Sequence, residues 1–115
     1  MIHHARTGAV IARAPRVAAT PWARAIGVLG TPFRSYDALV IPRCASVHTW
    51  FLGVSLDLLF VDGKGQVLRV IAPARPWGFH FGPRGTRTVI ELPVGALCGI
   101  AVSVGDSIEG LPSGV

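Results

Sequence analysis

The sequence predicts a mainly β fold, a small antiparallel β-barrel or sandwich with one or two short helices. Half of the 115 residues are hydrophobic, but they occur in short runs separated by 14 glycines and 9 prolines. Short apolar runs bounded by turn-forming residues are typical of buried strands, and the longest run, residues 54–61, is the candidate central strand. A chain of this length is the size of one domain and buries roughly two-thirds of the surface that its unfolded form exposes. We therefore expect residues 1–115 to form a single domain.

The first twenty residues predict a terminus followed by an edge strand. Residues 1–7, which include the pair His3 and His4, are expected to be disordered. Residues 8–20 predict a strand that contains Pro15. Because proline cannot donate to a ladder, it restricts this strand to the rim of a sheet or splits it into two pieces.

A short helix is expected at residues 21–29. Thr20 supplies an N-cap, Pro21 occupies the first helical position, and apolar residues recur at helical spacing before Gly30. The apolar residues of this helix are expected to contact the core.

The middle of the chain predicts a strand and then a hairpin. Residues 38–41 predict a short buried strand that ends at Pro42. A longer strand at 49–61 leads into a glycine-containing turn at 62–65, and residues 66–72 return as the second strand of the hairpin.

The last third of the chain predicts a long loop and then short elements. Residues 73–87 are rich in proline, glycine and aromatic residues, which predicts an irregular surface loop, and loops of this length in a compact domain are often functional. The elements expected after it are a strand at 88–92, a turn or single helical turn at 94–100, and a last short strand after the turn at Gly105 and Asp106.

Charge and composition exclude several classes of protein. Eleven basic residues against six acids give a net charge of +5, but the ten arginines are spread evenly and are not interleaved with aromatics, so no specific nucleic-acid site is predicted. No apolar run reaches the roughly 18 residues of a membrane-spanning helix, and no secretory signal is evident, so we expect a cytoplasmic protein. Two cysteines, Cys44 and Cys98, match neither a disulfide framework nor a zinc site.

An ordered set of residues resembles a known family. The set is Gly27-Val28-Leu29-Gly30; then Cys44, Ser46, Val47, His48 and Thr49; then Leu56-Asp57 and Phe60-Val61-Asp62; then Val89-Ile90-Glu91-Leu92-Pro93 with Gly95; and finally Gly105-Asp106. In this order and spacing the chain resembles the bacterial and archaeal "domain of unknown function 192" family, from about residue 22 to residue 108. The resemblance implies a small, mostly antiparallel β-barrel or sandwich with one or two short helices, and no established activity. Leu52 and Ser55 stand where members usually have methionine and proline, which puts any role for a thioether in doubt without threatening the fold.

Three residues are candidates for catalysis: His48, Asp57 and Glu91. One imidazole and two carboxylates can form a general acid–base pair or a facial metal site, and a hydrolase that uses His48 with Asp57 or Glu91 is one hypothesis. The structural interpretation is favoured, because both carboxylates lie among apolar strand residues and need backbone amides or a cation such as Arg87. We expect no metal site and no cofactor.

The favoured hypothesis is a binding module for a protein or an oligomeric ligand. The expected face combines residues near the central strand with the aromatic residues and arginines of the loop at 73–87. Its members are His48, Trp50, Arg75, Trp77, Phe79, His80, Phe81 and Arg87. Exposed aromatic rings supply a large contact area at little cost in entropy, and the arginines suit an anionic or peptide-like partner.

Overall fold

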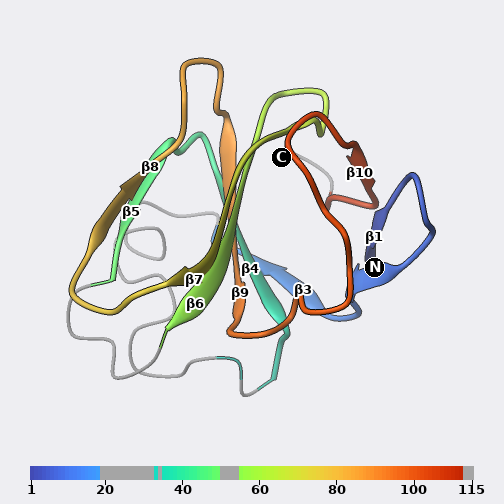
Figure 1. The fold of residues 1–115 in the computed structure, drawn as a ribbon, viewed down its shortest axis with the longest axis horizontal. Helices are drawn as coiled ribbons and strands as arrows, with labels where there is room; N and C mark the ends of the chain where they lie inside the picture. The colour runs from blue at the N-terminus through green and yellow to red at the C-terminus, as the bar shows by residue number, and fades with distance from the viewer. Residues whose placement is uncertain (19–32, 34, 50–54, 113–115) are drawn as a thin grey trace.

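The computed structural model describes residues 1–18, 33, 35–49 and 55–112, which contain ten strands in three sheets (Figure 1). The strands in chain order are β1 (Ile2–His4), β2 (Val10–Ala12), β3 (Pro15–Val17), β4 (Ala38–Pro42), β5 (Ser46–His48), β6 (Leu56–Val61), β7 (Val67–Ala74), β8 (Phe79–Phe81), β9 (Thr88–Pro93) and β10 (Ile108–Glu109).

A five-stranded sheet in the order β3-β4-β9-β6-β7 forms the centre of the molecule. Its neighbouring strands are antiparallel except β3 and β4, which run parallel. Every residue of β4 and β6 is buried, and so is every residue of β9 except Pro93. A strand covered on both faces needs apolar residues at successive positions, which explains the continuous apolar run of β6.

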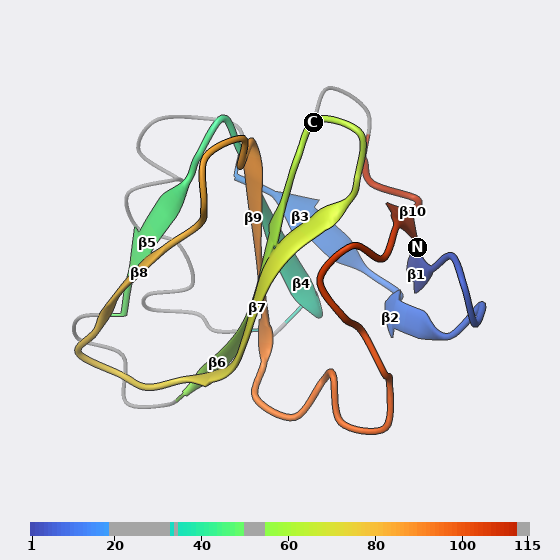
Figure 2. The same ribbon diagram turned by 45° about the horizontal axis from the view of Figure 1, so that its top comes forward.

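The two faces of the central sheet pack against different small sheets. Figures 1 and 2 show β5 and β8 on one side of the central sheet and β1, β2 and β10 on the other. One core cluster joins Leu59 of β6 to Ile2 of β1, and a second cluster joins Leu58 of β6 to Val47 of β5. Alternate residues of β6 therefore enter different cores, as the period of two in a strand requires.

The predicted mainly β fold is confirmed. The three sheets are not closed into a barrel, so the sandwich is the description that fits. The predicted hairpin is present as β6 and β7. Pro15 splits the first predicted strand: β2 ends at Ala12 in the three-stranded sheet, and β3 begins at Pro15 at the edge of the central sheet.

Three other predictions concern short elements, and two of them fall partly or wholly on residues that the structure does not describe. The helix expected at 21–29 lies outside the described residues, and the described part of the chain contains no helix. Residues 94–100 form successive turns, in which the amide of Cys98 donates to the carbonyl of Gly95 over 2.9 Å. The strand expected at 49–61 is shorter than predicted, because β6 begins at Leu56 and residues 50–54 lie outside the described part.

The prediction that residues 73–87 form an irregular loop is wrong in part. β7 continues to Ala74, and β8 pairs with β5 in an antiparallel two-stranded sheet. Thr49 holds the turn that leads into β8, because its hydroxyl donates to the carbonyl of Arg75 over 2.7 Å and accepts from the amide of Gly78 over 2.8 Å. These contacts join positions 26 and 29 residues apart, which local composition cannot reveal.

Residues 1–7, which the sequence led us to expect as disordered, contain β1 in the structure. β1 lies between β10 and β2, and Ile2 and His4 are fully buried. His4 contacts the hydroxyl of Thr7 at 2.8 Å through Nδ1 and the carboxylate of Asp106 at 2.7 Å through Nε2. Three residues are too few to show a period, and the partner strand β10 lies at the opposite end of the chain.

Candidate functional site

Asp57 lies on β6 with two backbone donors. Its side chain is 2% exposed and shares a sheet face with Leu59 and Val61. The carboxylate oxygen Oδ2 accepts hydrogen bonds from the amides of Gly95 and Leu97, each over 3.1 Å. Of the alternative partners expected for this carboxylate, the structure supplies backbone amides, and these hydrogen bonds join the turns at 94–100 to the central sheet.

Asp57 also lines a hollow of about 350 Å³. The other residues that line it are Ala72, Pro73, Val94, Gly95, Leu97 and Cys98. None of them is a histidine or a second carboxylate. General acid–base catalysis needs a proton donor and acceptor within hydrogen-bond reach of one substrate atom, and this lining offers no such pair with Asp57.

Glu91 lies on the opposite face of the same sheet. It alternates with Ile90 and Leu92, which belong to the first core, and shares the face of Val89, which belongs to the second. The side chain is 4% exposed, and its Oε2 has no hydrogen-bond partner in the described part of the chain. Burial raises the pKa of Glu91 to about 7, because removal from water disfavours the charged form.

Arg87, one of the alternative partners that the sequence offered for the buried carboxylates, does not pair with Glu91 in the described part of the chain. No ion pair joins these two described residues, and the Arg87 side chain is exposed, whereas Glu91 is buried. Among the described residues, Oε2 of Glu91 therefore meets neither a backbone amide nor a cation, the two kinds of partner that the sequence suggested.

His48 does not converge with either carboxylate. It is exposed on β5, and its neighbour Val47 is the residue of that strand that faces the core. Because successive side chains of a strand point to opposite faces, His48 points away from the sheet that carries Asp57 and Glu91. The structure thus separates the three residues of the predicted catalytic set.

His80 is the histidine that points inward from this small sheet. It lies opposite Val47 in the β5–β8 ladder, and its Nε2 is buried with no hydrogen-bond partner in the described residues. The sequence placed His80 in a binding face, whereas its half-buried ring lies on the side of the sheet that faces the core.

The outer face of the β5–β8 sheet carries the exposed aromatic residues. Phe79 lies opposite His48, and Phe81 lies opposite Ser46. The two phenylalanine rings contact each other edge to face, with centroids 4.5 Å apart, and their exposed fractions are 48% and 56%. We call His48, Phe79 and Phe81 the aromatic face.

The other predicted binding residues lie in different places outside the aromatic face or outside the described residues. Trp77, in the turn before β8, is 64% exposed, and Arg75 is exposed beside it. Trp50 lies outside the described residues. Arg87 lines a separate hollow at the start of β9, and none of the three members of the aromatic face lines that hollow.

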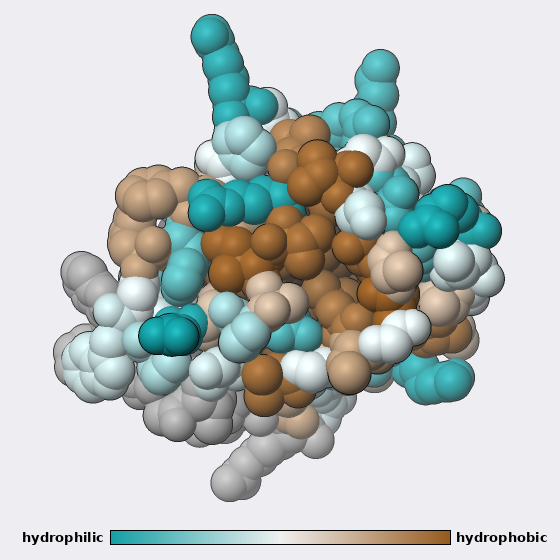
Figure 3. Space-filling view, in the orientation of Figure 1, coloured by the Kyte–Doolittle hydropathy of each residue, from teal (hydrophilic) through white to brown (hydrophobic). Residues whose placement is uncertain are grey.

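A second hydrophobic surface lies along β7. Figure 3 shows hydrophobic side chains gathered at the centre of the molecule over this strand, with polar residues around them. Leu68, Val70 and Ile71 of β7 are half-buried, and Val70 packs against the first core cluster whereas Ile71 packs against the second. β7 is the second strand of the hairpin that the sequence predicted, and it lies at the edge of the central sheet.

A network at the chain terminus was missed by the sequence analysis. The carboxylate of Asp106 accepts hydrogen bonds from His4 and Arg6 and from the amide of Ser103. The amide of Ser103, together with Arg6 and His4, lowers the pKa of Asp106 to about 2. The only local signal was the Gly105-Asp106 turn. Thr7, His4 and Asp106 form a hydrogen-bonded chain, and its contacts fasten β1 to the turn before β10.

The described residues contain neither a group of metal ligands nor a membrane-spanning helix. Within the ranges given above, no three histidine, cysteine, aspartate or glutamate side chains are grouped so that they could hold a metal ion. In the same ranges no helix is long and apolar enough to cross a membrane.

Comparison with known proteins gives uncharacterised relatives. A UPF0127 protein of Thermococcus sibiricus is 31% identical over 99 residues, which cover 82% of this chain and 64% of that protein. A UPF0127 protein of Pyrococcus abyssi is 35% identical over 65 residues, which cover 56% of this chain and 55% of that protein. The chain thus spans less than two-thirds of the length of these relatives.

Two crystal structures have the same fold. A protein of unknown function from Novosphingobium aromaticivorans superposes with a TM-score of 0.71 at 21% identity, covering 84% of this chain and 74% of that one. A Sinorhizobium meliloti protein proposed to be a transcription regulator gives a TM-score of 0.72 at 22% identity, covering 84% of this chain and 80% of that one. At these identities the likeness concerns the fold alone.

The family model that matches the chain covers nearly all of it, including β2, β3 and the last two residues of β1, which lay outside the resemblance seen in the sequence. The matched region is residues 3–110, and the family is described as "Uncharacterized ACR". The chain therefore belongs to the DUF192 family.

Proposed function

We propose that this protein is a binding module that docks an acidic segment of a partner protein on the aromatic face of the β5–β8 sheet. The observation that carries the proposal is the exposed edge-to-face pair of Phe79 and Phe81 beside His48. Rings that a strand directs outward supply contact area without further loss of backbone freedom on binding.

The charge of the surroundings favours an acidic partner. Arg69 donates from Nη1 to the carbonyl of Phe81 over 2.6 Å, so a guanidinium lies at the edge of the aromatic face. Arg75 is exposed in the segment that leads into β8, two residues before Trp77. With a net charge of +5, the chain attracts anionic partners at long range, and such attraction weakens as salt increases.

The alternative hydrolase has less support. A hydrolase would bring His48 together with Asp57 or Glu91, and these side chains point to different sides of the sheets that carry them. The fold shared with a proposed transcription regulator adds no nucleic-acid site, because it shows the architecture alone.

The direct test uses a defined probe. A synthetic peptide rich in glutamate with one phenylalanine is titrated into the isotopically labelled protein, and a peptide with lysine in place of glutamate is the charge-reversed control. The proposal expects saturable chemical-shift changes in β5 and β8 with the acidic peptide only. Equal shifts with both peptides, or shifts elsewhere on the surface, contradict it.

Matched variants then identify the surface. Replacing Phe79 and Phe81 by serine is expected to reduce capture of the natural partner from cell extract by at least about tenfold, which corresponds to roughly 1.4 kcal/mol. The control variant replaces Val94 and Val104, which are 55% and 65% exposed, by serine and is expected to capture the partner normally. If the control variant loses capture, or if the aromatic variant captures the partner as well as the native protein does, the partner binds elsewhere.

A further inference from the structure

The geometry points to a second site, in which Arg43 and Arg87 together bind the phosphate group of a soluble ligand. The site lies where β4 ends and β9 begins. Pro42 and Thr88 are the last paired residues of these strands, and the amide of Cys44 donates to the carbonyl of Arg87 over 3.0 Å. Arg43 and Arg87 therefore occupy facing positions just beyond the ladder.

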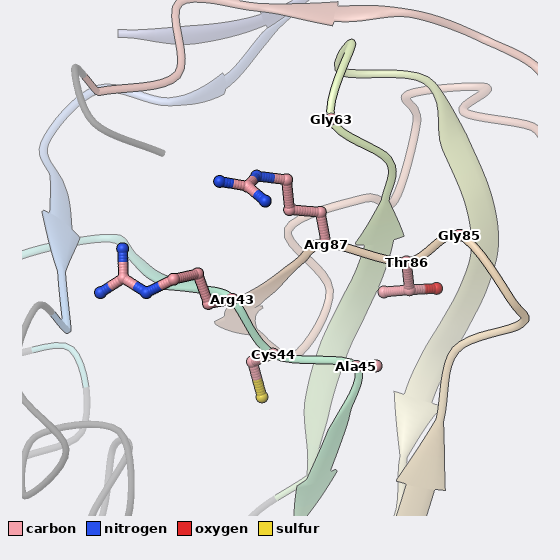
Figure 4. Close-up of a pocket in the computed structure, with 7 residues that line it drawn as sticks. All are labelled: Arg43, Cys44, Ala45, Gly63, Gly85, Thr86 and Arg87. Carbon is pink, nitrogen blue, oxygen red and sulfur yellow. The ribbon is translucent and has the colours of Figure 1, made fainter.

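The two arginines line an open hollow of about 430 Å³ (Figure 4). Figure 4 shows their side chains extending to the same side of the strands. The remaining lining residues are small or uncharged: Cys44, Ala45, Gly63, Gly85 and Thr86. A Cβ on Gly63 would lie 3.4 Å from Cδ of Arg87, which is an ordinary contact distance, so the Arg87 side chain lies against the β6–β7 turn.

Within the described part of the chain, no ion pair neutralises either guanidinium. All six aspartate and glutamate side chains of the chain lie in its described part, and none pairs with Arg43 or Arg87. Three of these carboxylates accept from backbone amides: Asp37, Asp57 and Asp62. Asp106 pairs with His4 and Arg6, and Glu109 pairs with His3. Glu91 is buried in the core.

Facing like charges repel each other, and a bound anion removes that repulsion. The Cys44 thiol, which also lines the hollow, donates to the carbonyl of Ser46 over 2.9 Å, so the arginines are the charged groups of the hollow. A guanidinium binds two oxygens through parallel N–H donors, so two guanidiniums match the several oxygens of a phosphate dianion better than a single carboxylate.

This site is separate from the aromatic face, and its test is independent of the proposed function. Inorganic phosphate is titrated into the ¹⁵N-labelled protein against chloride at constant ionic strength. We expect saturable shifts at the amides of Cys44, Gly63 and Thr86. Arg43→Gln and Arg87→Gln should each weaken the apparent affinity at least about fivefold, because each removes one charged donor fork.

Controls separate the site from general attraction to cations. Arg13→Gln removes the same charge at an exposed position outside the hollow and should leave the affinity within about twofold, as expected when a distant exposed charge is screened. Arg87→Lys keeps the charge without the fork and should bind more weakly than the native protein. The Phe79→Ser, Phe81→Ser variant should bind phosphate normally.

The source of the phosphate is distinguished with phosphatidylcholine vesicles that contain or lack phosphatidic acid. A soluble ligand predicts phosphate binding without sedimentation on either vesicle. Sedimentation on the acidic vesicles that the two arginine variants abolish would replace the soluble ligand by a lipid headgroup and contradict that part of the inference. Shifts that do not saturate, or that Arg13→Gln weakens as much as Arg87→Gln, would overturn the site itself.

Discussion

The two faces of the central sheet each bury one carboxylate, and the two carboxylates meet opposite conditions. Asp57 accepts from the amides of Gly95 and Leu97, whereas Oε2 of Glu91 has no partner in the described residues. Asp57 is covered by the turns at 94–100, whose backbone amides donate to it. Glu91 is on the face of the central sheet that packs against the layer containing β5 and β8. A buried carboxylate is thus part of the fold when backbone donors reach it and carries an electrostatic cost when they do not.

The largest expected effect comes from removing the charge of Glu91. Its pKa is raised from 4.5 to about 7, so the folded state binds the proton more tightly than the unfolded state does. The contribution of Glu91 to stability is greatest below pH 4.5 and is lost as the pH rises through about 7, by about 3 kcal/mol in total. Urea denaturation at pH 4.5 and pH 8 should show that Glu91→Gln removes this loss.

The control for that profile is Glu109→Gln. Glu109 is an exposed glutamate whose partner is His3, and its substitution should leave the pH dependence between these values nearly unchanged. If Glu91→Gln and the native protein lose stability in parallel as the pH rises, the claim that Glu91 is buried without a partner is wrong.

Removing the Asp57 carboxylate should have the next largest effect. Asp57→Ala leaves the amides of Gly95 and Leu97 unpaired, so we expect the free energy of unfolding to fall by about 1 to 3 kcal/mol. Asp57→Asn retains one carbonyl oxygen as an acceptor and should lose less. An unchanged melting temperature in the alanine variant would show that these hydrogen bonds do not stabilise the fold.

Asp106 provides a third carboxylate, in a network near the surface, and the smallest expected effect. Its pKa is lowered from 3.8 to about 2, so its contribution to stability is present above pH 3.8 and is lost as the pH falls through about 2. Acid denaturation followed by circular dichroism should therefore show a shallower loss between these values in Asp106→Asn. An acid limb identical to that of the native protein would mean that the His4–Arg6 network does not persist in solution.

The sequence could predict what depends on neighbouring residues. The β6–β7 hairpin follows from two apolar runs around a glycine-containing turn, and the break at Pro15 follows from the missing amide of proline. The need of Asp57 for a donor follows from its apolar neighbours alone.

The rest depends on contacts between distant segments. β8 forms because Thr49 binds the backbone at Arg75 and Gly78, and β1 forms because it pairs with β10. The difference between Asp57 and Glu91 is of the same kind, because both lie in apolar strands and only the chain path decides which one meets free amides. Arg43 was missed because its relation to Arg87 arises from the register of β4 and β9.

The most direct test of the contrast between the two faces is an NMR titration of the side-chain carboxyl carbon of Glu91. We expect a midpoint near pH 7, because burial without a partner raises the pKa of Glu91 to about this value. A midpoint near the ordinary 4.5 would contradict it, because it would show that water, a cation or a hydrogen-bond donor reaches this carboxylate in the folded protein.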